Sequence, residues 1–442
     1  MDRVTLQNYR CFREKQSARL APLTFLVGEN STGKTSFLAL LRALWQVAFG
    51  EIAPDFRETP YDMGAFEDLA YRGANGSSNT SFNAEFKYSL SPAADDKISY
   101  RVMFEDRGGY PFPCIRRFSN SGTWLEVDYR IDGNWIVRFG SGVSQYEHKI
   151  EYSSEHIGTE ALFPLEFTLR EVWRDAGRDS YGTPDYGKQS RTVDEVYRNL
   201  DRFSFGRFRV GNRFPPFASA PIRSRPRRTY DPSRPTPDPE GEYIPDYFAS
   251  MSRNEPEDWD RLKSDLEDFG RDSGLFDEIA VLSFGKMAGS PFQVQIRKCG
   301  RRLKGPRRNL IDVGYGVSQA LPILTELLRE DSPKMFLLQQ PEVHLHPRAQ
   351  AALGSLFCNL AASGKQIIVE THSDYILDRA RMDIRDGKTS LKADDVSILY
   401  FERDELDVNI YSLRVDEDGN VCDAPHGYGQ FFMDEMRRSV GL

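Results

Sequence analysis

One pattern near the start of the sequence constrains the fold of this chain more than any other feature. It consists of Gly28, Glu29, Asn30, Ser31, Thr32, Gly33, Lys34 and Thr35, and Ser36 follows it. The pattern fits G-x-x-x-x-G-K-[ST] and lies between an apolar run ending at Val27 and a run of helical periodicity from Lys34 to about Ala48. A chance match in a turn is the competing interpretation, but it does not explain why a strand precedes the pattern and a helix follows it.

Residues of this kind form a cradle for phosphate. Glycines let the backbone wrap closely, so that successive N–H groups and the helix N-terminus face the phosphate. Lys34 would supply a positive charge to the β and γ oxygens of a nucleotide, and Thr35 would place its hydroxyl on Mg²⁺. The sequence therefore predicts that residues 28–36 bind ATP, and that Thr35 contributes to a magnesium site.

Apolar periodicity predicts the elements around this loop. Residues 4–9 are expected to form an edge strand, residues 23–27 a buried strand and residues 34–48 a helix. From Ser81 onward the apolar period changes to two, which indicates an antiparallel sheet. Its expected strands are 82–90, 98–105, 123–130 and 134–140.

The middle of the chain has a different character. A helix is expected over 191–204, whereas 206–246 are rich in Pro, Arg, Tyr and Phe and have little periodicity. Residues 255–269 predict an amphipathic helix that stops at Gly270, and 292–298 predict a strand that leads back to strongly patterned sequence.

These elements predict an α/β fold: a P-loop NTPase with a mixed sheet, an antiparallel β subdomain and an inserted helical or irregular arm. The expected division is an N-terminal ATPase lobe at 1–150, an insertion at 151–285 and a C-terminal ATPase lobe at 286–442.

Composition limits the partners. The chain carries 58 Lys and Arg against 66 Asp and Glu, a formal net charge of −8, so it is a poor general binder of polyanions. Two local stretches, 202–228 and 297–308, are basic and are either solvated loops or phosphate-contacting patches, which leaves DNA open as a partner. With five scattered cysteines, no apolar signal region and no run near the roughly 20 apolar residues of a span, we expect a cytoplasmic protein without a membrane partner.

A second Gly-rich turn precedes the helix expected over 320–330. Gly316, Ser318 and Gln319 lie in it, and a hydroxyl at a helix N-terminus can bind an anion. An ordinary Ser-capped helix explains the same residues. If this helix start has no phosphate in its own subunit, it can approach the γ-phosphate held by another, and Ser318 would then act in trans.

The strand expected at 335 ends in polar groups at its carboxyl end, where α/β sheets hold their ligands. Gln339 is a candidate for the metal, and Gln340 and Glu342 are candidates for the attacking water. His344 and His346 either share one face of a strand or cap a turn before a helix at 348–360.

Another buried strand, at 366–370, ends in the sequence ETHSD. A histidine at such a strand end can bond a γ-phosphate or orient water, so His372 is the third catalytic candidate.

Taken together, these motifs resemble the ABC-type ATPase heads of the SMC, RecF and OLD group, and most of all the stand-alone AAA ATPases of prokaryotic defence and repair loci. QQPEVHLHP (339–347) resembles their variant Walker B motif, ETHSD (370–374) their switch-histidine loop and VGYGVSQALPIL (313–324) their degenerate signature. The likeness covers about 1–90 and 280–442; the middle matches loosely, at PIRSRPRRTY (221–230).

The resemblance implies that ATP binds between the P-loop of one subunit and the signature helix of a second, which closes a homodimer. It also implies that a nuclease or other effector is a separate polypeptide. One departure affects the chemistry, because related ATPases carry Asp-Glu where this chain has Gln339 and Gln340. Slow basal hydrolysis is therefore expected. An ATPase subunit of a transporter and a P-loop phosphotransferase are the alternative functions.

Overall fold

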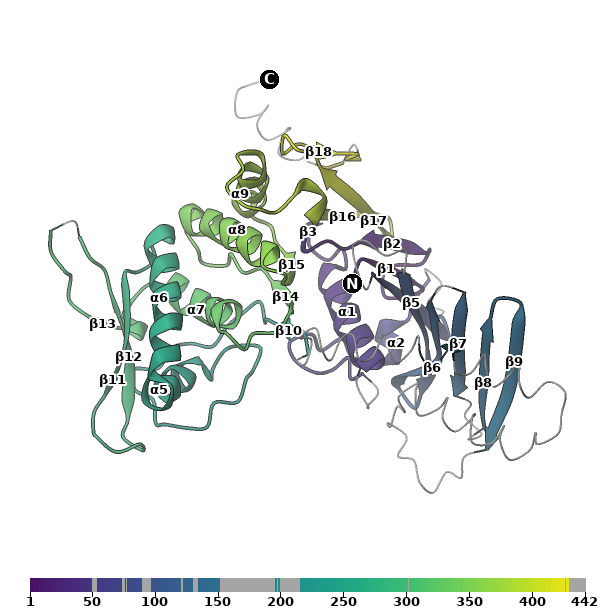
Figure 1. The fold of residues 1–442 in the computed structure, drawn as a ribbon, viewed down its shortest axis with the longest axis horizontal. Helices are drawn as coiled ribbons and strands as arrows, with labels where there is room; N and C mark the ends of the chain where they lie inside the picture. The colour runs from purple at the N-terminus through teal and green to yellow at the C-terminus, as the bar shows by residue number, and fades with distance from the viewer. Residues whose placement is uncertain are drawn as a thin grey trace.

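The computed structural model describes residues 1–49, 54–73, 76, 78–89, 97–120, 122–129, 134–151, 195–196, 198, 215–300, 302–425 and 427–428. The helix expected over 191–204 and the arginines of 202–213 lie largely outside these residues. Figure 1 shows an antiparallel sheet at one end of the molecule, helices and a small sheet at the other, and a central sheet between them.

The central sheet positions the P-loop. Its order is β10-β14-β15-β3-β16-β17-β18. The bounds are β10 Phe217–Ala218, β14 Met335–Gln339, β15 Gln366–Glu370, β3 Leu23–Gly28, β16 Val396–Asp404, β17 Asp407–Val415 and β18 Val421–Cys422. The first five strands in this order run parallel and the last two pair antiparallel, so the sheet is mixed, as predicted.

Successive side chains of the central strands point to opposite faces. Leu26, Leu337 and Ile368 belong to the core that α1 (Lys34–Phe49) shares with the antiparallel sheet. Their neighbours Phe25 and Val369 belong to a second core, which includes most of the helices. The carboxyl ends of β14, β15 and β3 therefore meet at one edge that both cores support.

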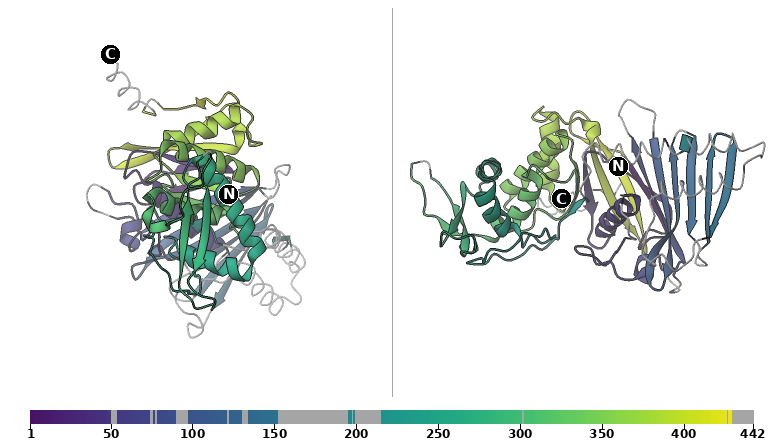
Figure 2. Two further views of the ribbon diagram at one scale, coloured as in Figure 1. Left: turned by 90° about the vertical axis from the view of Figure 1, so that its left-hand side faces the viewer. Right: turned by 60° about the horizontal axis from the view of Figure 1, so that its bottom comes forward.

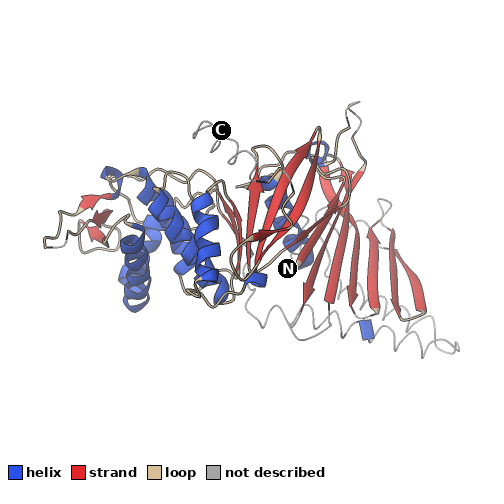
Figure 3. Cartoon of the chain, turned by 90° about the horizontal axis from the view of Figure 1, so that it is seen from above, coloured by secondary structure: helices blue, strands red, loops and turns tan. Residues whose placement is uncertain are grey.

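The second core contains most of the helices, shown in blue in Figure 3. Their bounds are α5 Ile244–Asn254, α6 Pro256–Ser273, α7 Tyr315–Leu328, α8 Pro347–Ala362 and α9 Asp374–Arg385. A short helix, α2 (Phe66–Leu69), packs in the first core. The small sheet consists of β11 Glu278–Ser283, β12 Phe292–Arg297 and β13 Arg308–Asn309.

Two helix boundaries differ from the prediction. α6 continues through Gly270, since this glycine lies against Phe276, and the helix ends before Gly274, whose φ of 75° is left-handed. α7 begins at Tyr315 rather than 320, so the predicted signature residues lie inside the helix and not in a turn before it.

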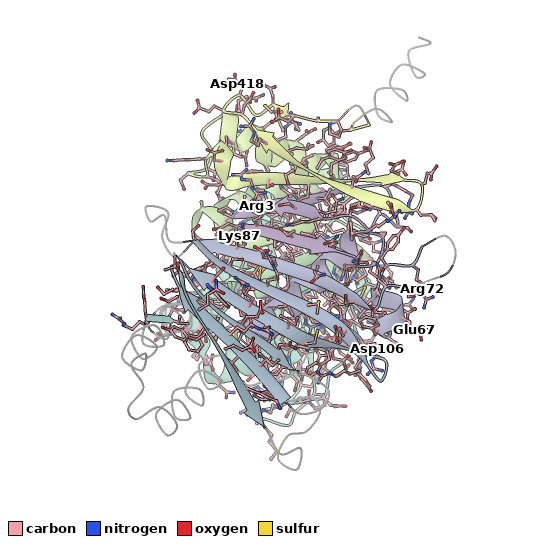
Figure 4. The ribbon with its side chains drawn as sticks, turned by 90° about the vertical axis from the view of Figure 1, so that its right-hand side faces the viewer. Arg3, Glu67, Arg72, Lys87, Asp106 and Asp418 are labelled. Carbon is pink, nitrogen blue, oxygen red and sulfur yellow. The ribbon has the colours of Figure 1, made fainter. Side chains whose placement is uncertain are left out.

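The antiparallel sheet has the order β2-β1-β4-β5-β6-β7-β8-β9 and forms the end of the molecule on the right of Figure 2. Its strands are β2 Gln16–Arg19, β1 Arg3–Gln7, β4 Ser81–Ser89, β5 Lys97–Arg107, β6 Tyr110–Asn120, β7 Thr123–Tyr129, β8 Asn134–Ser141 and β9 Ser144–Glu151. Figure 4 shows Arg3 and Lys87 on the neighbouring strands β1 and β4.

This sheet corrects two expectations. The first strand of the chain is not an edge strand, because β1 pairs with both β2 and β4. β6 was not predicted because it contains Pro111 and Pro113, which disfavour a ladder strand. A register shift opposite Pro113, between Met103 and Phe104, accommodates the prolines.

All five cysteines are free. In the described part of the chain, no helix has the length and apolarity needed to cross a membrane.

Candidate functional site

The P-loop holds its shape through its own contacts. Gly28 has a φ of 138°, and a Cβ there would lie 2.4 Å from the carbonyl oxygen of Phe401 on β16, so only glycine fits. The ammonium of Lys34 donates to the carbonyls of Gly28 (2.9 Å) and Glu29 (2.6 Å). Burial lowers the pKa of Lys34, while the carboxylates of Glu370 and Glu29 oppose that shift. These two bonds hold the ammonium of Lys34 against the backbone of the loop.

Thr35, the residue predicted to contact metal, bonds to Glu370. Its hydroxyl lies 2.9 Å and 3.2 Å from the two carboxylate oxygens. Glu370 is the last residue of β15 and is 6% exposed. Burial raises its pKa, the Thr35 hydrogen bond and the charge of Lys34 lower it, and the charge of Glu342 raises it further. No catalytic or metal-binding role for Glu370 was predicted, although an acid at the end of a buried strand was a signal for one.

Glu342 lies beside this pair. Its Oε1 accepts the backbone N–H of His372 at 2.7 Å, and its Oε2 has no hydrogen-bond partner. Burial raises the pKa of Glu342, while hydrogen bonds from the His372 backbone and the Thr371 side chain and the charge of Arg223 oppose that shift. Burial also lowers the pKa of His372, and the nearby charge of Lys34 lowers it further. The structure therefore places Glu342 near Glu370, and His372 near Lys34 of the P-loop.

The two glutamines at the end of β14 take different positions. The side-chain amide of Gln339 donates to the carbonyl of Ser219 (3.2 Å), beside β10, and not to a P-loop group. Gln340 has a left-handed φ of 41°, and its N–H donates to the carbonyl of Glu370 (2.8 Å). The structure does not bring the Gln339 side chain to Thr35, whereas Gln340 lies at the turn between β14 and Glu342.

A buried arginine, Arg223, also lies at the carboxyl end of β14, and no role of its own was predicted for it from the sequence. Arg223 is 2% exposed and donates through Nη2 to the carbonyls of Gln339 (3.4 Å) and Gln340 (3.2 Å). Its Nε and Nη1 have no hydrogen-bond partner. Burial lowers its pKa to about 10, and the charge of Glu342 opposes this shift. An arginine in a Pro- and Arg-rich segment gives no sequence signal for burial, because its environment is set by contacts far along the chain.

The predicted signature residues lie on the other side of Arg223. The Gln319 amide accepts the Arg223 N–H (3.1 Å) and donates to the Arg223 carbonyl (3.3 Å). Ser318 is buried and donates to the carbonyl of Tyr315 (3.0 Å). A Cβ on Gly316 would lie 2.8 Å from the carbonyl of His344. These residues fix α7 against the end of β14, and the exposed part of the helix start is Gly314 and Tyr315.

A cavity of about 530 Å³ opens at the P-loop. Its lining includes Asn30, Ser31, Gly33, Lys34, Thr35, Ser36 and Glu370. The other lining residues include Arg10, Tyr71, Arg72 and Leu406. The cavity has the size of a small-molecule site.

His344 and His346 belong to a turn and not to a strand. His344 has a left-handed φ of 66°, and His346 caps α8, accepting the N–H of Arg348 on Nδ1 (3.2 Å). No group of three or more His, Cys, Asp and Glu with metal-binding geometry occurs among the described residues.

Much of the positive charge in the described basic segments is paired. Arg227 bonds Glu242, Arg228 bonds Asp312 (2.6 Å), and Arg297 and Lys304 both bond Glu278 (2.8 Å). Pairing of this kind weakens the case for a phosphate-contacting patch, and DNA binding stays a prediction.

Comparison with known proteins shows the family to which this chain belongs. A family model described as "AAA domain, putative AbiEii toxin, Type IV TA system" matches residues 23–378. A search of curated proteins gave no match.

Similar solved structures are heads of SMC proteins. One is an SMC head bound to the C-terminal winged-helix domain of ScpA, with a TM-score of 0.46 and 11% identity, covering 94% of this chain and 98% of that chain. Another, from Pyrococcus furiosus, is an SMC head with an extended coiled coil bound to the C-terminal domain of ScpA; its TM-score is 0.43 at 10% identity, with 99% of each chain covered. The SMC head of Thermotoga maritima has a TM-score of 0.37 at 12% identity, covering 94% of this chain and 99% of that chain.

The family match runs from the P-loop strand β3 through the switch-histidine loop into α9. The chain therefore belongs to this AAA-domain family.

Proposed function

We propose that this protein is an ATP-dependent switch that binds Mg-ATP, hydrolyses it slowly and dimerises around the nucleotide. One observation carries the proposal: Lys34, Thr35 and the buried carboxylates of Glu370 and Glu342 converge at the carboxyl ends of β3, β15 and β14. A strand-end site of this kind, beside a P-loop, suits phosphoryl transfer to water.

The residues present fit a magnesium ion. The hydroxyl of Thr35 would hold it, and oxygen donors are the ligands that Mg²⁺ prefers. When bound, the ion neutralises charge on the β- and γ-phosphates. Of the chain's own groups, Glu342 has a carboxylate oxygen without a hydrogen-bond partner and would act as the base for the attacking water, and Gln340 and His372 are the candidates to orient that water.

The start of α7 supports a dimer. Gly314 and Tyr315 are exposed at its N-terminus, where the helix dipole favours negative charge. A triphosphate held by a second subunit can approach there, as the trans arrangement requires. Ser318 and Gln319 would act by fixing this helix start, since both are buried. Gly316 would allow its close approach to His344.

A separate effector, such as a nuclease, would be the controlled partner, in antiphage defence or DNA repair. The family description, which names a toxin of a toxin–antitoxin system, supports a defence role. A phosphotransferase would have no use for the exposed start of α7, and a transporter subunit would need a membrane partner.

The test is nucleotide binding and mass in solution. The parent should bind a non-hydrolysable ATP analogue in Mg²⁺ and double its mass, measured by light scattering. Lys34→Ala should lower affinity by about 10- to 150-fold, since a charged hydrogen bond contributes about 1.5–3 kcal/mol.

Tyr315→Glu isolates the dimer from nucleotide binding. A carboxylate there suits the helix dipole but repels the partner's phosphates, so monomers should bind the analogue and stay monomeric. Tyr315→Gln is the neutral control. Equal dimer formation by the Glu and Gln variants would refute the trans arrangement, and an unchanged affinity of folded Lys34→Ala would refute the P-loop assignment.

A further inference from the structure

We propose that Glu370, at the end of β15, is the acidic group of the magnesium site, in place of the β14 position occupied by Gln339. This inference rests on the proposed function, because the ion would arrive with ATP. The acidic residue of the metal site would then lie on β15 and not on the neighbouring strand β14.

The register of the sheet puts Glu370 where it can serve. β15 lies between β14 and β3, and Glu370 is the register partner of Gln339 on one side and Leu26 on the other. It is therefore one strand nearer to the P-loop than Gln339. Both of its carboxylate oxygens reach the hydroxyl of Thr35, at 2.9 Å and 3.2 Å. That hydroxyl is the group a P-loop offers to Mg²⁺.

The bonding of Gln339 removes the competing candidate. Its backbone N–H donates to the hydroxyl of Ser219 (3.1 Å), and its side-chain amide donates to the Ser219 carbonyl (3.2 Å). Neither group contacts the P-loop. Gln339 is 4% exposed. The side chain thus bonds the segment after β10, which lies on the side of β14 away from β15.

Lys34 and Arg223 offset the two buried carboxylates, so a bound triphosphate would give the site an excess of negative charge that a cation would balance. Glu370 and Glu342 are both buried and act electrostatically on each other, and Glu342 Oε2 has no hydrogen bond. Lys34 is the near positive charge on the P-loop side, and Arg223 on the β14 side. Mg²⁺ is usually bound by one or two carboxylates together with phosphates and water, and this donor set fits that pattern.

The experiment compares ATP affinity with and without magnesium in the parent and in Glu370→Gln. Affinity for a non-hydrolysable analogue is titrated in Mg²⁺ and in EDTA. In Mg²⁺ the variant should bind about 10- to 100-fold more weakly, the usual effect of removing a group that supports a metal. In EDTA it should bind as tightly as the parent or more tightly, since a negative charge near the triphosphate is gone.

Three further variants of the chain serve as controls. Glu370→Asp keeps the charge and should retain part of the magnesium effect. Gln339→Ala should leave it unchanged. Asp378→Asn, which removes an exposed carboxylate on α9, is the matched charge control.

The outcomes separate this inference from the proposed function. Weaker binding by Glu370→Gln in both buffers would indicate a structural role and overturn the inference, as would a magnesium effect lost in Gln339→Ala but kept in Glu370→Gln. A parent that binds no nucleotide in either buffer would overturn the proposed function and this assignment with it.

Discussion

The two halves of the candidate site differ in how completely their polar groups are bonded. At the ends of β3 and β15, the side chains of Lys34, Thr35 and Glu370 all have hydrogen-bond partners. At the end of β14, by contrast, Arg223 has two donors without partners and Glu342 has an unpartnered oxygen. A buried unpaired polar group costs about 1–3 kcal/mol. The half proposed to bind phosphate is therefore fully bonded, and the half proposed to hydrolyse ATP has buried polar atoms without hydrogen-bond partners.

The largest effect on the difference between the two halves is expected from Glu342→Gln. If Glu342 is the base, turnover should fall by about 100-fold or more, because general bases contribute about 10²–10⁴. ATP affinity should stay near that of the parent, since the P-loop contacts do not involve Glu342. Steady-state ATPase and equilibrium binding measure the two effects.

The amide can still accept the His372 N–H through Oε1, so the variant is expected to fold. Unchanged turnover would mean that the unbonded oxygen of Glu342 is not catalytic, and the contrast between the two halves would lose its functional meaning.

Arg223→Met tests the half of the site at the end of β14, where Arg223 is the only buried cation among the described residues. The variant loses the bonds to the carbonyls of Gln339 and Gln340 and the positive charge near Glu342. Turnover should fall about tenfold, the order expected when a group that orients a catalytic residue is removed. ATP affinity should change little.

Arg227→Met is the matched control, because Arg227 lies on the same segment but is exposed and paired with Glu242. Arg223→Lys should recover part of the loss. Equal turnover in both methionine variants would assign Arg223 to packing alone.

The smallest effect is expected from Gln340→Glu. A carboxylate can accept a proton from water and an amide cannot, which should raise turnover. A third carboxylate beside Glu342 and Glu370 also adds repulsion, so the gain should be only a few-fold. Comparison of ATPase rates at matched protein concentration measures it; a fall in turnover would place Gln340 away from the water.

Local sequence was sufficient for the P-loop, its strand and its helix, because glycine spacing and apolar periodicity are set within a few residues. It was insufficient for the rest of the edge. Thr35 and Glu370 lie 335 residues apart in the chain, and Gln319 and Arg223 lie 96 apart. Their contacts depend on strand order, with β15 between β14 and β3, and no periodicity encodes that order. α7 was also expected to begin later than it does, because Gly314 and Gly316 are typical of a turn; in the structure Gly316 lies in the first turn of the helix, close to the carbonyl of His344.

The folded-back position of Lys34 has a consequence for which ligands the site accepts. Its ammonium already bonds two loop carbonyls, so any ligand that draws it away must replace both bonds. A ligand with a single phosphate, too short to reach the ammonium, gains nothing from it. One with a longer phosphate chain replaces neutral carbonyl oxygens with charged ones, and charge-assisted bonds are stronger. If the loop binds nucleotide as proposed, these two bonds would make Lys34 favour nucleotides with a longer phosphate chain over those with a single phosphate.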